Sequence, residues 1–125
     1  MKLQLTILEN QFIVHRLAST AKIPEQVFSS SFYSITRSDE ELSIVCSAEL
    51  DLASDKTEIA WSCIKALGPL DFALTGILAA ISKALAEAKI SIFAISTFDT
   101  DYILVKTDKL ETAKHVLEQA GYEFK

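Results

Sequence analysis

Two short stretches of this 125-residue chain carry the residue types that could bind a small molecule. The first runs from Asp71 to Ile77, and its glycine, Gly76, stands directly before an apolar, alanine-rich segment. A helix that opens on a glycine presents free backbone N–H groups at its positive end, where a carboxylate or a phosphate can bind. Thr75 could cap the first turn of this helix. The first stretch therefore predicts an anion-binding corner.

The second stretch is a polar corner, Ser96-Thr97-Phe98-Asp99-Thr100-Asp101, at the end of a predicted strand. Its carboxylates offer hydrogen-bond acceptors to a cation such as an ammonium group. N–H donors in one stretch and carboxylates in the other suit a zwitterion, above all a free amino acid. The candidate ligand-binding residues are therefore Asp71, Thr75, Gly76, Ile77, Thr97, Phe98 and Asp101.

Each candidate also has an ordinary structural interpretation. Gly76 could simply permit a helix to pack closely on a sheet. The aspartates at positions 71, 99 and 101 could be turn residues, which is the commonest use of Asp in loops. Phe98 could form a wall of the ligand site or plug the core. The expected convergence of both stretches at one end of a sheet is what favours binding.

Hydrophobic periodicity predicts the elements that would position these residues. Thr57 to Leu67 has the pattern of a strand, and a helix is predicted over residues 75–88 because Ile77, Ile81 and Leu85 recur at helical spacing. The order β-α-β-β-α-β of this second half is that of ferredoxin-like folds. The remaining elements are strands at 90–98 and 102–106, a helix capped by Asp108 and ended by Gly121, and a short strand at 122–124.

The first half of the chain has the same kind of strands but no long helical pattern. An acidic, irregular segment at 48–56 marks the predicted boundary between an N-terminal half, residues 1–56, and a C-terminal domain, residues 57–125. The predicted elements of the first half are strands at 2–8, 12–17, 31–37 and 42–47 and one helical turn that opens at Pro24.

A weak internal repeat connects the two halves. Ser31–Ser47 aligns without a gap with Ser91–Thr107, at an offset of 60 residues (91 − 31 = 60), and both segments have the pattern strand, acidic corner, strand. We interpret this as a degenerate repeat whose first copy has lost its helix. A chance similarity between two hairpins is the alternative.

Composition and charge exclude several classes of function. The formal net charge is −5 and the pI is near 5.0, which disfavours nucleic acid and anionic membranes as partners. The alternating N-terminus predicts a strand rather than a signal peptide, and no apolar run is long enough to span a bilayer. Lone thiols at Cys46 and Cys63 are typical of a reducing compartment, so a cytoplasmic location is expected.

Catalytic chemistry finds little support in the sequence. His15 and His115 lie in different predicted elements, without further ligands at metal spacing, and we expect both to face solvent. Neither cysteine has an evident histidine partner, and no nucleophile elbow is present. We therefore expect no enzyme, no metal and no cofactor.

The stretch Asp71…Gly76-Ile77-Leu78-Ala79-Ala80-Ile81-Ser82 resembles the signature of the ACT domain, a regulatory module that binds amino acids. Gly68-Pro69-Leu70-Asp71-Phe72, Thr75-Gly76-Ile77 and residues 95–101 resemble in particular its CASTOR-type branch of cytosolic arginine sensors. The resemblance is specific over roughly residues 57–121 and weaker over residues 32–46.

This resemblance implies an α+β fold of tandem ACT-like, ferredoxin-like βαββαβ modules with antiparallel sheets, the first module being degenerate. It implies a free amino acid, with arginine among the ligands, held at an ACT–ACT interface. The sensors have four modules and this chain has two, so the interface would form in a homodimer or between the two halves. The main alternative is a structural dimerisation module with an empty site, whose sheet edges pair between subunits. An unrecognised enzyme is the third interpretation.

Overall fold

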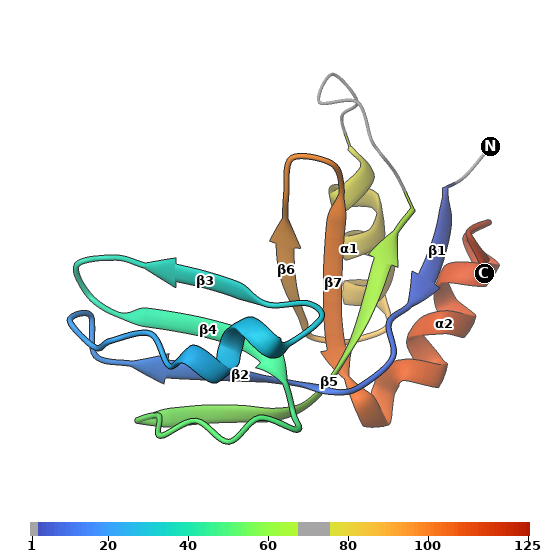
Figure 1. Cartoon of the computed structure of the whole chain (residues 1–125). Coiled ribbons are helices and arrows are strands. Elements are labelled where there is room, and N and C mark those ends of the chain that lie inside the picture. The colour runs from blue at the N-terminus through green and yellow to red at the C-terminus, as the bar shows by residue number, and fades with distance from the viewer. Residues whose placement is uncertain (1–2, 68–75) are drawn as a thin grey trace. The chain divides into compact units, whose positions relative to one another are not determined.

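The computed structural model describes residues 3–67 and 76–125 (Figure 1). Contacts divide the chain into two compact units, which we describe separately. The C-terminal unit consists of Met1–Glu9 and Ser62–Lys125, and the N-terminal unit consists of Asn10–Trp61. The predicted division into two homologous halves stays a prediction, while these contacts group the first nine residues with the C-terminal unit.

The C-terminal unit has an antiparallel-rich sheet with the strand order β6-β7-β5-β1-β8. Its central strand is the second part of β5, which as a whole spans Lys56–Ala66. The other elements are β1 (Gln4–Ile7), α1 (Ile77–Glu87), β6 (Ile92–Ser96), β7 (Asp101–Lys106), the 3-10 turn η2 (Thr107–Lys109), α2 (Leu110–Gln119) and β8 (Glu123–Phe124).

The N-terminal strand β1 takes a place in this sheet that the sequence pattern does not reveal. It pairs antiparallel with β5, with Leu5 opposite Ala66. The last strand, β8, pairs in parallel with β1 rather than with β5, and Phe124 lies opposite Leu5. The strand from the chain's beginning thus occupies the position that the last strand holds in a ferredoxin-like order.

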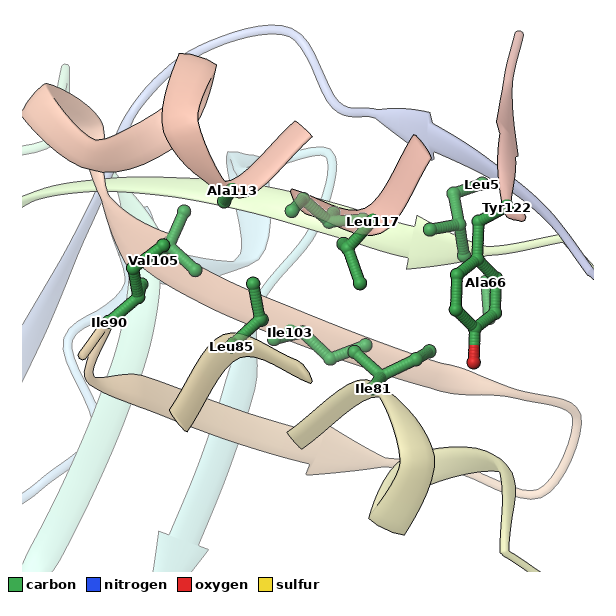
Figure 2. Close-up of a cluster of buried hydrophobic side chains, with 11 residues drawn as sticks. Leu5, Ala66, Ile81, Leu85, Ile90, Ile103, Val105, Ala113, Leu117 and Tyr122 are labelled. Carbon is green, nitrogen blue, oxygen red and sulfur yellow. The ribbon is translucent and has the colours of Figure 1, made fainter. Parts of the chain in front are cut away.

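Helices α1 and α2 lie against one face of this sheet, and the core of the unit lies between them and the strands (Figure 2). The predicted stripe of α1 is confirmed, because Ile81 and Leu85 are fully buried in this core. Burial of each such side chain contributes about 1.5–3 kcal/mol. The buried core residues are Leu5, Ile64, Ala66, Ile81, Leu85, Ile90, Ile103, Val105, Ala113, Leu117 and Tyr122.

The N-terminal unit has a four-stranded sheet with the order β3-β4-β2-β5, in which β5 contributes its first part. Its core is a smaller apolar cluster that includes Val27, Leu42 and Ile44. In place of helices the unit has one 3-10 turn and an irregular segment at 48–55. Its elements are β2 (Phe12–Leu17), η1 (Glu25–Ser29), β3 (Ser34–Arg37) and β4 (Leu42–Ser47).

The two units share one strand order. The order β3-β4-β2-β5 of the N-terminal unit corresponds to β6-β7-β5-β1 of the C-terminal unit. Turn η1 stands where α1 stands in the chain order, and the irregular segment stands where α2 does. These correspondences support the interpretation of a degenerate repeat.

The hairpins of the two units fix the alignment of the repeat. Arg37 pairs with Leu42 across β3 and β4, and Ser96 pairs with Asp101 across β6 and β7, so each hairpin closes with a four-residue loop. Arg37 therefore corresponds to Ser96, at an offset of 59 residues. The offset of 60 expected from the sequence is therefore wrong by one residue. An alignment shifted by one residue would match side chains that lie on opposite faces of the two sheets.

Both helices end in the same backbone motif. After α2, the Tyr122 N–H donates to the Leu117 carbonyl at 3.0 Å and the Gly121 N–H donates to the Glu118 carbonyl at 3.0 Å. With Gly121 at φ 100°, this is a Schellman motif, as predicted. The cap predicted at the other end is wrong: Asp108 lies in η2, and α2 begins at Leu110 without a side-chain cap.

The Schellman motif after α1 uses a lysine where α2 uses a glycine. The Ile90 N–H donates to the Leu85 carbonyl at 2.9 Å, and Lys89 has φ 61°, a left-handed conformation that the Cβ atom disfavours.

We expect Lys89→Gly to raise the free energy of unfolding by about 0.5–1 kcal/mol, because glycine adopts this conformation without steric cost. Urea unfolding of the variant and the wild type measures the difference. Lys89→Ala is the matched control, since it removes the same charge and keeps the Cβ atom. Equal stabilisation by alanine and glycine would show that charge, and not backbone conformation, is the cause.

Candidate functional site

The corner between β6 and β7 is held by hydrogen bonds within its own four residues. The Thr97 N–H donates to the Thr100 carbonyl at 2.8 Å, and the Thr97 hydroxyl donates to the same carbonyl at 3.1 Å. The Thr100 N–H donates in turn to the Thr97 hydroxyl at 3.3 Å. Thr97 thus shapes the corner, and the side chains that follow it leave the loop in a defined direction.

Thr100 attaches this corner to the neighbouring strand. Its side chain is only 5% exposed, and its hydroxyl donates to the Ala66 carbonyl at the end of β5 at 2.6 Å. The bond places the corner beside the point where the chain leaves the sheet toward α1. Thr100 is not among the site residues predicted from the sequence. Its only signal was a threonine at the last position of a hairpin loop.

Asp101 is the carboxylate that this corner presents. It is the first residue of β7 and half-buried, and its Oδ1 accepts a hydrogen bond of 2.6 Å from the hydroxyl of Ser96, its cross-strand partner. This bond orients the carboxylate through Oδ1 and does not involve Oδ2. Such an oriented, partly exposed carboxylate can accept a hydrogen bond from an ammonium or a guanidinium group.

The start of α1 supplies backbone donors. Gly76 has φ 81° and ψ −1°, and its carbonyl accepts the first intrahelical bond, from the Ala80 N–H at 2.8 Å. The N–H groups of the first turn before Ala80 have no acceptor within the helix. Ile77 contributes its N–H to this turn while its side chain packs against the core.

The glycine at position 76 is required by backbone conformation and not by close packing. A Cβ atom at Gly76 would meet no atom within 4 Å, whereas the left-handed φ of 81° is unfavourable for other residues. The packing alternative for Gly76 therefore does not hold. Asp71 and Thr75, the two other candidates of the first stretch, lie outside the described residues.

The start of α1 and the corner between β6 and β7 lie at the same end of the C-terminal unit's sheet (Figures 1 and 2). Gly76 and Ile77 are thus at the end where Thr97 and Asp101 stand. Phe98 projects from the same corner with 78% of its surface exposed. It does not plug the core, and an aromatic side chain remains at the rim of the candidate site.

The cysteines are poor nucleophiles. Both are free and buried, and burial raises the pKa of the Cys63 thiol to about 12 and the pKa of Cys46 above its ordinary value. Among residues 3–67 and 76–125, no group of three or more His, Cys, Asp and Glu side chains is placed to hold a metal ion. Within the same residues, no helix is long and apolar enough to cross a membrane.

His15 does not face solvent as expected. It is 2% exposed, and its Nδ1 lies 2.9 Å from the Ser54 hydroxyl. The irregular segment at 48–55 covers this face of β2, which strand alternation alone could not show. Burial lowers the pKa of His15, and the nearby carboxylate of Asp51 opposes part of that shift.

Two family models match this chain. A model of the ACT domain matches residues 56–119, and a second family model, of an N-terminal domain, matches residues 10–50. The first match contains the start of α1 and the corner between β6 and β7. The second match lies within the N-terminal unit.

Similar proteins include sensors and regulatory subunits. The chain is 32% identical over 127 aligned positions to the cytosolic arginine sensor for mTORC1 subunit 1 of Pongo abelii, which covers 91% of the chain and 37% of that protein. The chain thus spans about a third of that relative. The crystal structure of protein Atu0741 from Agrobacterium tumefaciens superposes with a TM-score of 0.92 at 36% identity, covering 100% of this chain and 93% of that one. The regulatory subunit of aspartate kinase from Thermus thermophilus has the same fold, with a TM-score of 0.67 at 9% identity over 97% and 99% of the two chains.

We expect the protein to lose stability as the pH falls below about 6.5, because of His15. The unfolded chain takes up a proton near the ordinary pKa of 6.5, whereas the folded chain does so only at a lower pH. The contribution of His15 is therefore fully present above pH 6.5 and is lost as the pH falls toward the lowered folded-state pKa. Urea unfolding at a series of pH values measures this decline.

The variant His15→Gln should flatten the decline, since it removes the titrating group. His115→Gln is the matched control, because His115 is exposed on α2 and its loss should leave the decline in place. A wild-type profile that His15→Gln leaves unchanged would contradict the assignment.

Proposed function

Because this chain belongs to the ACT domain family, we propose that it is a non-catalytic regulatory module that binds a free amino acid in its C-terminal unit. The observation that carries this proposal is that α1 and β7, whose first residue is Asp101, both begin at one end of a single sheet (Figure 1). One group offers backbone donors and the other offers a carboxylate. A free amino acid carries the two charges that complement them.

In the proposed complex the ligand's α-carboxylate accepts hydrogen bonds from the N–H groups of Gly76 and Ile77, at the positive end of α1. The ammonium group donates to Asp101 and to backbone carbonyls near Thr97. Phe98 covers the ligand from the rim. Asp71 and Thr75 remain part of the proposed site on the strength of the sequence alone.

Arginine is the first ligand to consider. The relative from Pongo abelii is named as an arginine sensor, and the chain aligns with it over 91% of its own length. A guanidinium group needs acceptors beyond those that bind the α-ammonium. Asp99, exposed in the same corner, supplies a second carboxylate.

The proposed signal is a change in subunit pairing. The ligand is held at an ACT–ACT interface, which in this proposal forms between two copies of the chain. A ligand that binds one arrangement of the copies more tightly than another shifts the equilibrium toward that arrangement. No reaction is needed for such a signal.

A structural dimerisation module with an empty site is the second candidate function. The observation in its favour is β6, an edge strand of the C-terminal sheet whose five residues, Ile92–Ser96, carry no charge. In proteins that stay monomeric, charged residues or proline commonly protect the edge strands from pairing with another chain. In this form of the hypothesis Phe72 or Phe98 would fill the pocket. Phe72 lies outside the described residues, and the 78% exposure of Phe98 speaks against Phe98.

We expect at least one of the twenty amino acids to raise the melting temperature of the wild-type protein. At a ligand concentration 100 times the Kd, the stabilisation is about 2.7 kcal/mol. Asp101→Asn should abolish the response to that amino acid, because the carboxylate that binds the ammonium group is lost. Thermal-shift assays followed by isothermal titration measure both effects.

Asp108→Asn is the control for this experiment, since it removes the same charge from an exposed position in η2. It should keep the full ligand response. A folded wild-type protein that no amino acid stabilises would overturn the proposed binding function, as would an Asp101→Asn variant that responds like the wild type.

If β6 forms a subunit interface, Ala94→Lys should convert a dimer into a monomer. Ala94 is exposed in the middle of β6, and a lysine there would place a charge in the pairing edge. Light scattering coupled to gel filtration measures the mass. Thr112→Lys, at an exposed position of α2, should leave the mass unchanged. A wild-type protein that is monomeric at high concentration contradicts this second function.

A further inference from the structure

The corners of the two units have the same backbone hydrogen bonds. In the N-terminal unit the Ser38 N–H donates to the Glu41 carbonyl at 2.9 Å, and the Glu41 N–H donates to the Ser38 hydroxyl at 3.2 Å. Thr97 and Thr100 make the corresponding bonds in the C-terminal unit. Position by position, the residue before the corner is Arg37 in one unit and Ser96 in the other.

Arg37 uses this position to hold the segment that leads from β2 to η1. Its Nη1 donates to the Ser19 carbonyl and its Nη2 donates to the Ala21 carbonyl, the second bond at 2.8 Å. Residues 18–24 correspond in chain order to the segment between β5 and α1. The Arg37 guanidinium therefore joins the end of β3 to the segment that follows β2.

We propose that the carbonyls of Ser19 and Ala21 form a guanidinium-binding site that the chain fills with its own Arg37. The N-terminal unit then carries a built-in ligand at the position that corresponds to the amino-acid site of the C-terminal unit. The comparison between the two positions rests on the proposed function. The guanidinium site itself does not depend on it.

The two corners differ at the strand positions that flank their loops. Where the C-terminal unit has the carboxylate of Asp101, the N-terminal unit has Leu42, which is fully buried. Where the N-terminal unit has the cation of Arg37, the C-terminal unit has Ser96, whose short side chain is bonded to Asp101 at 2.6 Å. At these aligned strand positions one unit has a cation and the other has an acceptor for a cation, while both loops carry carboxylates.

A tether without a binding site is the competing explanation. In that case Arg37 would only restrict the motion of residues 18–24, and no free ligand could replace its side chain. A preformed site makes a different prediction, because its two carbonyls keep their geometry when the side chain is removed. A free guanidinium group can then occupy the place of the lost one.

The test is chemical rescue of Arg37→Ala. We expect the substitution to lower the melting temperature by about 3–5 °C, because two hydrogen bonds to a charged donor are lost. Methylguanidinium at millimolar concentration should restore most of this loss in a saturable manner. Methylammonium and sodium chloride at equal ionic strength should not, since neither offers two parallel N–H donors.

Arg16→Ala is the matched control. Arg16 lies in the same unit and donates to a single carbonyl, that of Glu40, at 3.2 Å, beside a long ion pair of 3.9 Å with Asp55. Methylguanidinium should not rescue this variant or stabilise the wild type beyond the effect of salt. If Arg37→Ala does not fold, Arg37→Gln takes its place in the same assay.

Destabilisation without rescue would overturn the guanidinium site and leave Arg37 as a tether. Unchanged stability without methylguanidinium binding would overturn it as well. The outcome is separate from that of the amino-acid screen: a wild type that no amino acid stabilises refutes the proposed function, while rescue of Arg37→Ala still establishes the internal site.

Discussion

The hydrogen bond from the buried Thr100 hydroxyl to the Ala66 carbonyl is the interaction on which the candidate site depends. It joins the corner between β6 and β7 to the last residue of β5, where the chain leaves the sheet. A buried carbonyl that loses its partner costs about 1–3 kcal/mol, so the corner has little freedom to move away. The packing of Ile81 and Leu85 then directs α1 so that its N-terminus begins at this same end.

Much of this arrangement is predictable from local sequence, because the forces involved act over a few residues. The stripe of α1, the strand at Phe12–Leu17 and the glycine after α2 each follow from spacing or backbone conformation. The glycine before the α1 pattern and the carboxylate of Asp101 in the hairpin corner can also be identified from the sequence. Their position at one end of a sheet follows from the β-α-β-β order.

What the sequence does not show is set by contacts between distant residues. The burial of His15 requires the segment around Ser54, which has no periodicity of its own. The place of β1 depends on pairing with β5 in the middle of the chain and with β8 at its end. Asp108 has the right type for a cap, yet η2 takes the residues after β7 and delays α2 to Leu110. The two repeat segments are too dissimilar in sequence to fix their alignment to one residue. The pairing of the two hairpins does fix it, at an offset one residue shorter than expected.

A repeated frame with unequal corners has a consequence for specificity. Both units offer a corner of the same backbone geometry, so the frame alone would not distinguish one corner from the other as a place for a ligand. The side chains do distinguish them, because the position of Asp101 is taken by the buried Leu42 in the N-terminal corner, and the position of Ser96 is taken there by Arg37. Asp39, Glu40 and Glu41 make the loop of the N-terminal corner acidic as well, so the two corners differ at the strand positions that flank the loops and not in the sign of the loop charge. In the proposed function, these two substitutions leave the C-terminal corner as the one with an oriented carboxylate at the first position of its second strand.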